Sequence, residues 1–449
     1  MTIMSAMRDE TVITAQRFRH FRTIRSNQQY CKPTVTPAHA NLMEENSIVA
    51  RLLLRNENCN FQIQNASMSA PLPSPHIVIL GASFAALTAV RELRKHAPQA
   101  RISLIAPKAE FFYLPSLIWI PSGLRSGADL TLPLDRFLHD HGVQFIAGRA
   151  TGLKDGGRTV ETDAGEIKND ALLIATGSRF IKKLPGIEHA LTLCEGIASA
   201  EAIRDRVNAM TSGRIAIGFG GNPNEPAAMR GGPMFELLFG LDTMLRQQGM
   251  RDRIELTFFN AAAEPGKRLG EKAVSGLLAE MARRRIDTHL GHKLLGFSDK
   301  GVDTEGGHIN ADLILFMPGL AGPAWAADTG LPLSPGGFFK ADEFCRVDGA
   351  EKVFVAGDAG SFPGPDWMPK QAHMADLQAK AAAKNLLSTL AGKPVSHRFK
   401  IELICIVDTL DQGIMVYRDL KRSILLPSSR LFHWAKRFFE GHYLKIFRH

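Results

Sequence analysis

The chain has 449 residues, 45% of them hydrophobic and 22% charged, the balance of an ordinary globular protein with room for two or three domains. The net charge of +9 predicts an anionic partner such as a nucleic acid or a membrane surface. The sequence has no apolar run of about 18 residues, so we expect no membrane-spanning helix. The five cysteines lie far apart without Cys-x-x-Cys spacing. We therefore expect no disulfide scaffold, no metal site and a reducing compartment.

Residues 1–70 differ in character from the rest of the chain. A basic cluster at residues 17–22 is diluted by acidic residues on both sides, and no apolar stretch of signal-peptide length follows it. We expect a poorly ordered extension, or a start codon assigned upstream of a natural start at Met68.

A dinucleotide-binding loop is predicted after the apolar strand of residues 76–80. Gly81 permits a tight turn, and Ser83 is small enough for the backbone to approach a pyrophosphate. Phe84 and Ala85 begin a helix whose N-terminus would face the phosphates, and Ala86 keeps that helix close to the strand. A βα turn without a ligand is the alternative reading.

The next strand, residues 101–106, departs from the dinucleotide pattern. An acidic residue that holds the ribose hydroxyls is expected at its end, but Ala106-Pro107-Lys108 stands there instead. We therefore expect ribose binding to be arranged differently here, with Ala106 and Lys108 among the cofactor-binding residues.

Two later elements identify the cofactor as FAD. A buried strand ends in Ala175-Thr176-Gly177, the turn that lies beside FAD in two-dinucleotide flavoproteins. A second strand ends in Gly357-Asp358, which in such proteins brings the aspartate to the ribitol chain. Three elements in this order predict an FAD-binding protein.

A second fingerprint begins at residues 214–221 but is interrupted. Pro223 and Pro226 stand where a helix N-terminus would offer N–H groups to a pyrophosphate, and proline has none. The helix is expected to start later, near Gly232-Pro233. We predict a middle domain that keeps a Rossmann-like fold without binding NAD(H).

The predicted fold class is α/β, with two Rossmann-like FAD/NAD(P)-binding domains in three β/β/α layers and a C-terminal amphipathic segment. The FAD-binding domain is discontinuous and spans residues 71–187 and 310–392. The second domain spans residues 188–309, and residues 393–449 form a C-terminal interface or membrane-association region.

The C-terminal tail carries an apolar stripe at helical spacing among many basic residues. Basic amphipathic segments lie in the headgroup region of anionic membranes, so we expect an anionic membrane surface as a partner. A helix that docks onto the body or onto a second subunit, as in a homodimer, is the alternative reading. No nucleic-acid motif is present. The stripe consists of Phe432, Ala435, Phe438, Phe439, Tyr443 and Ile446.

Cys345 lies thirteen residues before Asp358, where a thiol is expected to come close to the isoalloxazine ring. A flavin with a nearby thiol indicates thiol redox chemistry if a second cysteine pairs with the first, and Cys194 is the candidate. The alternative is that both cysteines are small buried core residues.

Together these residues resemble the sulfide:quinone oxidoreductase family, including flavocytochrome c sulfide dehydrogenase. The resemblance runs from about residue 76 to the C-terminus. It is carried by residues 191–194, Gly232-Pro233 with residues 235–239, Cys345 before the Gly-Asp strand, Pro369-Lys370 after it, and residues 432–436 with Phe439-Glu440.

The resemblance implies that Cys194 and Cys345 form a redox pair that oxidises sulfide to sulfane sulfur, with electrons passing through FAD to a membrane quinone. It places Lys370 near the flavin pyrimidine oxygen, where a cation stabilises the reduced anionic ring. A peripheral location on the cytoplasmic side of the cell membrane follows. The rivals are a type II NADH:quinone oxidoreductase and a non-catalytic flavin-binding protein.

Overall fold

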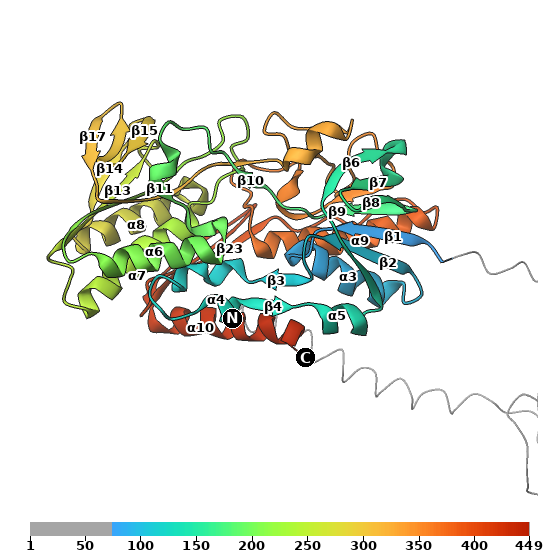
Figure 1. The fold of residues 1–449 in the computed structure, drawn as a ribbon, viewed down its shortest axis with the longest axis horizontal. Coiled ribbons are helices and arrows are strands. Elements are labelled where there is room, and N and C mark those ends of the chain that lie inside the picture. The colour runs from blue at the N-terminus through green and yellow to red at the C-terminus, as the bar shows by residue number, and fades with distance from the viewer. Residues whose placement is uncertain (1–73, 449) are drawn as a thin grey trace, which may run out of the picture. The chain divides into compact units, whose positions relative to one another are not determined.

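The computed structural model of the protein describes residues 74–448. Two five-stranded parallel sheets form the centre of the fold (Figure 1). Strands of the first sheet are β1 (His76–Leu80), β2 (Arg101–Ala106), β5 (Val143–Ala147), β9 (Ala171–Ile174) and β21 (Val353–Val355), in the order β21-β9-β1-β2-β5. Strands of the second are β11 (Ala190–Leu191), β12 (Gly213–Phe219), β13 (Ile254–Asn260), β14 (Asp287–Leu290) and β18 (Leu313–Met317), in the order β11-β18-β12-β13-β14. The sheets define what we call the first and second Rossmann units.

Each parallel sheet is accompanied by a three-stranded antiparallel sheet. In the first unit it is β6 (Ala150–Lys154), β7 (Thr159–Thr162) and β8 (Gly165–Lys168); in the second it is β15 (Leu294–Ser298), β16 (Gly301–Thr304) and β17 (Gly307–Asn310). Short two-stranded pairings join β3 (Glu110–Phe112) to β4 (Thr131–Pro133), β10 (Arg179–Phe180) to β19 (Leu320–Ala321), and β20 (Phe339–Lys340) to β22 (Gly360–Ser361).

The helices are α3 (Phe84–His96), α4 (Gly127–Leu130), α5 (Asp135–Asp140), α6 (Ile197–Ala209), α7 (Gly232–Gln247), α8 (Glu271–Arg283), α9 (Ala372–Leu390) and α10 (Arg430–Arg448). No helix among residues 74–448 is long and apolar enough to cross a membrane.

Strand β1 shows why the first unit has three layers. Its residues are all buried, and because successive side chains point to opposite faces, they enter two separate cores. Ile77 and Ile79 pack in the core that contains α3 and α9, whereas Val78 and Leu80 pack with Leu153 of the antiparallel sheet. The α/β class with β/β/α layers is confirmed.

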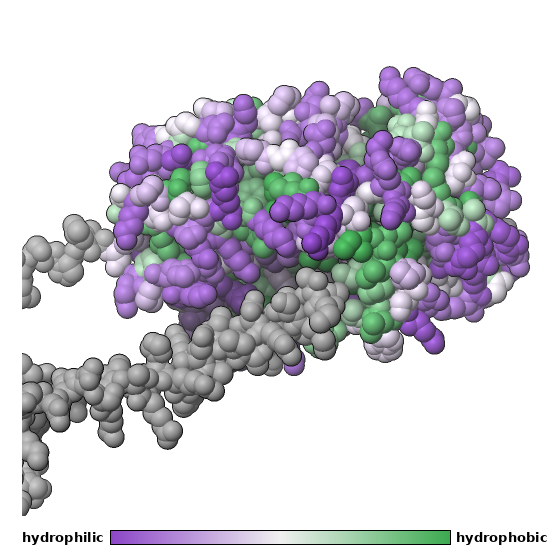
Figure 2. Space-filling view, turned by 180° about the vertical axis from the view of Figure 1, so that it is seen from behind, coloured by the Kyte–Doolittle hydropathy of each residue, from purple (hydrophilic) through white to green (hydrophobic). Residues whose placement is uncertain are grey.

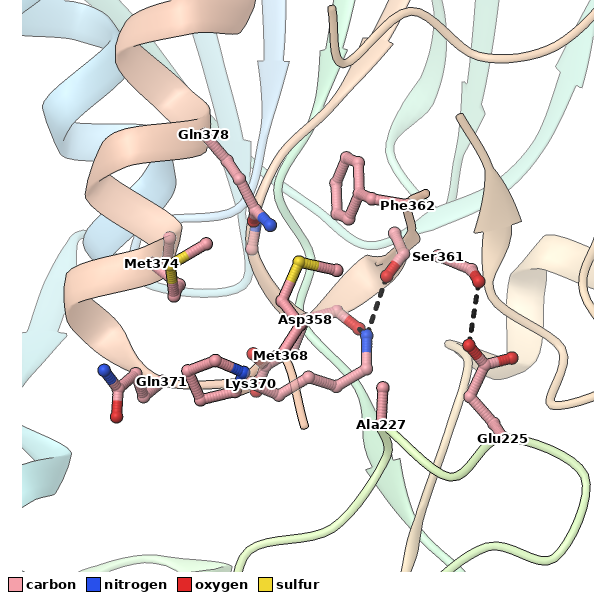
Figure 3. Close-up of a pocket in the computed structure, with 14 residues that line it drawn as sticks. Glu225, Ala227, Asp358, Ser361, Phe362, Met368, Lys370, Gln371, Met374 and Gln378 are labelled. Atoms are coloured by element: carbon pink, nitrogen blue, oxygen red, sulfur yellow. Dashed lines mark hydrogen bonds between the residues drawn. The ribbon is translucent and has the colours of Figure 1, made fainter. Parts of the chain in front are cut away.

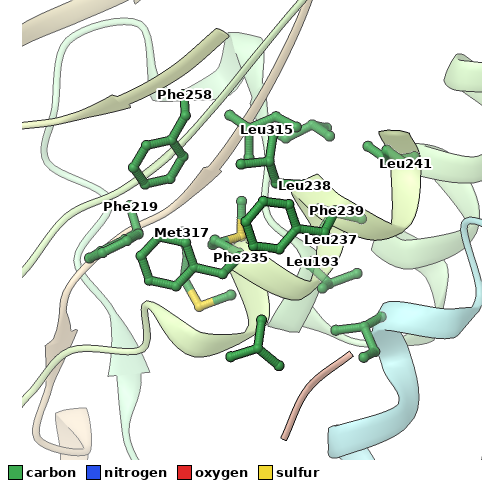
Figure 4. Close-up of a cluster of buried hydrophobic side chains, with 14 of the residues drawn as sticks. Leu193, Phe219, Phe235, Leu237, Leu238, Phe239, Leu241, Phe258, Leu315 and Met317 are labelled. Carbon is green, nitrogen blue, oxygen red and sulfur yellow. The ribbon is translucent and has the colours of Figure 1, made fainter. Parts of the chain in front are cut away.

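The core of the second unit is built around α7, which is buried on nearly all sides (Figure 4). Phe235 packs against Phe219 of β12 and Phe258 of β13, with ring centroids 5.5 and 5.3 Å apart. Because α7 also contacts the C-terminal sheet, it has little solvent-facing surface. That sheet consists of β23 (Glu402–Asp408), β24 (Gly413–Asp419) and β25 (Ser423–Ser429).

Helix α10 follows β25 and runs along the lower edge of the view in Figure 1, below α4, β4 and α5. The predicted extension over residues 1–70 lies outside the described residues. The domain boundaries given above stay predictions.

Candidate functional site

The dinucleotide loop of the first unit has the geometry that a pyrophosphate needs. Gly81 has φ of +111°, and a Cβ there would lie 2.3 Å from the carbonyl oxygen of Ala175, so only glycine fits. Helix α3 begins at Phe84 directly after Ser83, whose side chain does not cap it. Its first-turn N–H groups are thus free of a side-chain cap, and the helix N-terminus favours an anion.

The adenosine end of this site keeps the departure seen in the sequence. Ala106 is the last, buried residue of β2, and the exposed Lys108 beyond it forms an ion pair with Glu110 at 3.9 Å. No structural feature assigns a ribose contact to either Ala106 or Lys108, so their role stays a prediction.

The turn after β9 lies next to the loop, as predicted. Ala175 donates its N–H to Leu80 O at 2.8 Å, which fixes the turn beside the end of β1. Thr176 Oγ1 accepts a hydrogen bond from Trp325 Nε1 at 3.3 Å, and Gly177 has a positive φ of +71°. The carboxyl ends of β1, β9 and β21 therefore meet at one edge of the sheet, where ligands of such folds bind.

The Gly-Asp turn lies at this edge. Gly357 N donates to Gln378 Oε1 of α9 at 2.9 Å, and Asp358 is 9% exposed. Asp358 Oδ2 accepts a hydrogen bond from Arg230, and the two form an ion pair between the Rossmann units. Sequence reasoning missed Arg230, because nothing in its local sequence indicates a partner 128 residues away.

A small cavity lies beside Asp358 (Figure 3). One wall comes from the first unit and the other from the loop that follows β12 in the second. The residues that line this cavity include Glu225, Asp358, Ser361, Phe362, Met368, Lys370, Met374, Ala375 and Gln378.

Lys370 is the cationic side chain of this cavity. Its Nζ donates to Gly360 O at 2.7 Å and to Asp358 O at 3.3 Å, and it lies 4.0 Å from the centroid of the Phe338 ring. Burial lowers its pKa to about 8, against the opposing effect of the carboxylates of Asp358 and Glu225. The expected place of Lys370 near the flavin pyrimidine oxygen stays a prediction.

The second Rossmann unit has no open dinucleotide loop at the corresponding place. Residues 81–83 separate β1 from α3, whereas residues 220–231 separate β12 from α7, and Pro233 stands in the first turn of α7. Asn222 closes a turn by accepting the N–H of Glu225 at 3.1 Å and donates Nδ2 to Leu320 O at 2.8 Å. The interruption predicted from the prolines is present.

This loop, residues 220–231, is held against the first unit by hydrogen bonds. Ser361 Oγ donates to Glu225 Oε1 at 2.8 Å (Figure 3). Arg268 donates to Met229 O at 2.9 Å and to Met368 O at 2.6 Å, and burial lowers its pKa to about 10. The loop therefore forms a wall of the cavity that is bonded to the first unit at several points.

Cys345 is a buried core residue of the first unit. Its side chain is fully buried in the core between the first sheet and its helices, and it is a free thiol. Sγ donates to Gln378 O at 3.6 Å, and burial raises the pKa well above its usual value, which disfavours the nucleophilic thiolate. The main chain has φ of +66°, which turns this residue away from a regular strand.

The main chain at Cys194 lies in the 3-10 helix η4 (Leu193–Glu195), directly ahead of α6, as predicted. Leu193 belongs to the core of the second unit, whereas Cys345 belongs to that of the first. The redox role of the two cysteines stays a prediction. Among the described residues no cluster of His, Cys, Asp or Glu could hold a metal ion.

Three polar side chains of the C-terminal helix contact the body of the protein. Lys436 forms an ion pair with Glu236 of α7, Glu440 with Arg125, and His433 Nδ1 lies 2.7 Å from Asp408 Oδ2. Burial raises the pKa of Glu236 to about 7, against the effect of Lys436. Lys436 is partly buried in this contact.

The opposite face of α10 is apolar and exposed. Leu431, Trp434, Phe438 and Phe439 are 69, 61, 60 and 49% exposed. Hydrophobic side chains reach the lower edge of the molecule in the space-filling view, the edge along which α10 runs (Figure 2). One face of the helix thus docks onto the body, and the other is uncovered.

The geometry at Gly81 predicts that Gly81→Ala lowers the FAD content of the purified protein to below about a third of wild type, because the new methyl group displaces the turn after β9. The measurement is the ratio of flavin to protein absorbance after gel filtration. Gly123→Ala is the control, since Gly123 has a similar positive φ of +76° but no atom within 4 Å of its Cβ position. Wild-type flavin content in Gly81→Ala would contradict the assignment of this loop.

If Lys370 lies near the flavin, as the sequence predicts, we expect the flavin midpoint potential to depend on pH. Below its pKa of about 8 the ammonium is charged and stabilises the reduced, anionic ring; above that pH the stabilisation is lost. Replacing it in Lys370→Gln should lower the midpoint potential at pH 7 by roughly 30–60 mV and have little effect at pH 10. Potentiometric titration checks this, with the exposed Lys352→Gln as control. Equal potentials at pH 7 would remove Lys370 from the flavin environment.

Known proteins with similar sequences include quinone reductases. A sulfide-quinone reductase from Aquifex aeolicus (strain VF5) is 24% identical over 398 residues, which covers 82% of this chain and 90% of the relative. A type II NADH:quinone oxidoreductase from Staphylococcus aureus (strain NCTC 8325 / PS 47) is 24% identical over 341 residues, which covers 71% and 83%. Both match over most of their own length.

Solved structures show the same fold. The sulfide:quinone oxidoreductase of Aquifex aeolicus superposes with a TM-score of 0.77 at 22% identity, covering 84% of this chain and 92% of that chain. NDH2 from Plasmodium falciparum superposes with a TM-score of 0.64 at 12% identity, covering 83% and 95%. The predicted resemblance to sulfide:quinone oxidoreductases is confirmed.

A family model described as pyridine nucleotide-disulphide oxidoreductase matches residues 75–379, more than half of the chain. The match spans the dinucleotide loop, the Gly-Asp turn and Lys370, which fit FAD as described above. The protein therefore belongs to the pyridine nucleotide-disulphide oxidoreductase family and is an FAD-dependent oxidoreductase.

Proposed function

We propose that this protein oxidises sulfide to sulfane sulfur and passes the electrons to a quinone. The observation that carries the proposal is the closed loop of the second unit, which sets the chain apart from enzymes that take electrons from NADH. The similarity to a sulfide-quinone reductase over most of both chains supports sulfide as the donor.

The type II NADH:quinone oxidoreductases are the competing assignment, because they also match this chain. An NADH-dependent enzyme needs a helix N-terminus and a glycine-rich turn for a second pyrophosphate. Here Pro233 stands in the first turn of α7, and Asn222 and Glu225 close the preceding loop on itself. These features favour a donor without a nucleotide.

FAD supplies the two-electron chemistry of the reaction. Oxidation of hydrosulfide to sulfane sulfur releases two electrons and one proton, and reduction of a quinone to the quinol takes up two electrons and two protons. Lys370 supplies a positive charge at the cavity, and Asp358 with Arg230 holds its shape. Phe362, Met368 and Met374 add apolar side chains to the lining of this cavity.

The predicted Cys194 and Cys345 relay is the finer part of this proposal. A persulfide mechanism requires a thiolate that sulfide or the flavin can reach. The burial and raised pKa of Cys345 favour the alternative in which this thiol packs the core and the cavity acts without it.

We further propose that the protein binds peripherally to an anionic membrane, on the cytoplasmic side. The outward face of α10 combines exposed Leu431, Trp434 and Phe438 with the basic Arg430 and Arg437, the pattern of helices that lie in the headgroup region. Exposed apolar surface of this kind is costly in water and is stabilised by lipid.

Anaerobic titration with sulfide tests the donor. We expect sulfide to bleach the flavin absorbance near 450 nm and added decylubiquinone to restore it. No bleaching would contradict the proposal and favour a flavin-binding protein without this activity.

Two cysteine variants in the same titration separate the thiol mechanisms. We expect Cys345→Ala to keep bleaching within about threefold of wild type, because a fully buried core thiol is replaced by a slightly smaller apolar group. Loss of bleaching in Cys345→Ala with normal FAD content, and in Cys194→Ser, would instead establish the relay.

The membrane proposal predicts that Trp434→Ser with Phe438→Ser weakens binding to vesicles of phosphatidylglycerol and phosphatidylcholine about 10- to 100-fold, because each side chain loses its apolar transfer free energy. Cosedimentation measures this. Leu295→Ser is the control, since Leu295 is 48% exposed but lies on β15, away from α10. Equal loss in the control, or none in the double variant, would contradict the assigned face.

A further inference from the structure

The first turn of α3 is packed against the C-terminal helix. Phe84 follows Ser83 of the dinucleotide loop directly and is 6% exposed. Its ring centroid lies 5.0 Å from that of Phe111 and 5.4 Å from that of Tyr443 on α10. The residue that starts the pyrophosphate-binding helix is therefore held in place by a ring from the last helix of the chain.

A partly buried carboxylate joins the same elements. Asp376 of α9 accepts a hydrogen bond from Thr88 Oγ1 of α3 at 2.6 Å. The hydroxyl of Tyr443 donates to both oxygens of Asp376, at 3.3 and 3.4 Å. Helices α3, α9 and α10 thus meet at one side chain, one turn beyond Phe84.

Helix α9 continues this connection to the cavity. Met374, Ala375 and Gln378 line the cavity, and Gln378 Oε1 holds the N–H of Gly357 beside Asp358. Asp376 lies between these residues in the sequence and faces the other two helices. A displacement of Tyr443 would therefore reach the cofactor site both through α3 and through α9.

We propose that Tyr443 is a positioning residue for FAD, acting through Phe84 and Asp376, so that cofactor binding and docking of α10 stabilise each other. Such coupling is reciprocal: whatever fixes α10 tightens FAD binding, and FAD strengthens the docking of α10 by the same factor. The inference rests on FAD binding, and only its last test depends on the proposed membrane seat.

Measurement of FAD affinity in the apoprotein tests this directly. We expect Tyr443→Ala to raise the dissociation constant for FAD about 5- to 10-fold, because it removes the ring packed on Phe84 and the hydroxyl on Asp376. Tyr443→Phe keeps the ring and should raise it only about two- to threefold. His442→Ala is the matched control, since the adjacent His442 is exposed on the same helix.

A merely structural role for Tyr443 would lower the melting temperature of the apoprotein and leave the FAD dissociation constant unchanged. That result would overturn the proposal. If Tyr443→Ala does not fold, hydrogen exchange of the wild-type protein decides instead. We expect FAD added to the apoprotein to slow exchange in residues 430–448 and 84–90 together, and unchanged exchange in residues 430–448 would contradict the coupling.

A further test of the coupling uses lipid vesicles and depends on the proposed membrane binding. Phosphatidylglycerol vesicles should tighten FAD binding to the wild-type protein about threefold or more and have no such effect on Tyr443→Ala. If the protein does not bind the vesicles, the membrane seat fails while the measurements in solution still test Tyr443. If it binds them and FAD affinity does not change, the proposed coupling to the lipid-facing helix is wrong.

Discussion

The ion pair between Arg230 and Asp358 joins the two Rossmann units at the flavin cavity, and the form of the site depends on it. Asp358 is almost buried, and a buried carboxylate without a partner is strongly destabilising. Asp358 therefore holds Arg230, and with it the whole loop of residues 220–231, against the first unit. Glu225 with Ser361, and Arg268 with Met229 and Met368, reinforce this closure. The segment that would bind a second dinucleotide instead forms a wall of the flavin cavity.

The C-terminal helix applies the same physical rule to a different surface. Its charged residues Lys436 and Glu440 pair with buried partners, and its large apolar residues Trp434 and Phe438 remain uncovered. Tyr443, Leu444 and Phe447 of the same helix pack inward, so the helix has apolar side chains on both its inner and its outer side. The uncovered outer side supports the proposed lipid-facing role, and the inner side contacts the first turn of α3.

The sequence predicts the FAD elements well because each depends on the main chain. Gly81 is required by the close approach of Ala175 O, and such a constraint leaves a recognisable residue. The interrupted second fingerprint is equally readable, since proline has no N–H to offer. These features need no knowledge of distant partners, and the structure confirms the β/β/α fold they predict.

Side-chain direction and long-range pairing are harder to read. Cys345 precedes the Gly-Asp strand as expected, but its main chain is in the left-handed region and directs the thiol into the helix-side core. Arg230 lies 128 residues from Asp358, and Lys436 lies 200 residues from Glu236, so no local pattern predicts either pair. Helical spacing in the tail places the residues on faces without showing which face meets the body.

Calorimetric titration of the FAD-loaded protein with NADH tests the central claim that the second nucleotide site is closed. The account predicts no binding heat at NADH concentrations up to about 1 mM, because the loop that would hold the pyrophosphate is bonded to the flavin cavity. A dissociation constant in the micromolar range would contradict it, and would place this protein with the NADH-dependent members of its family.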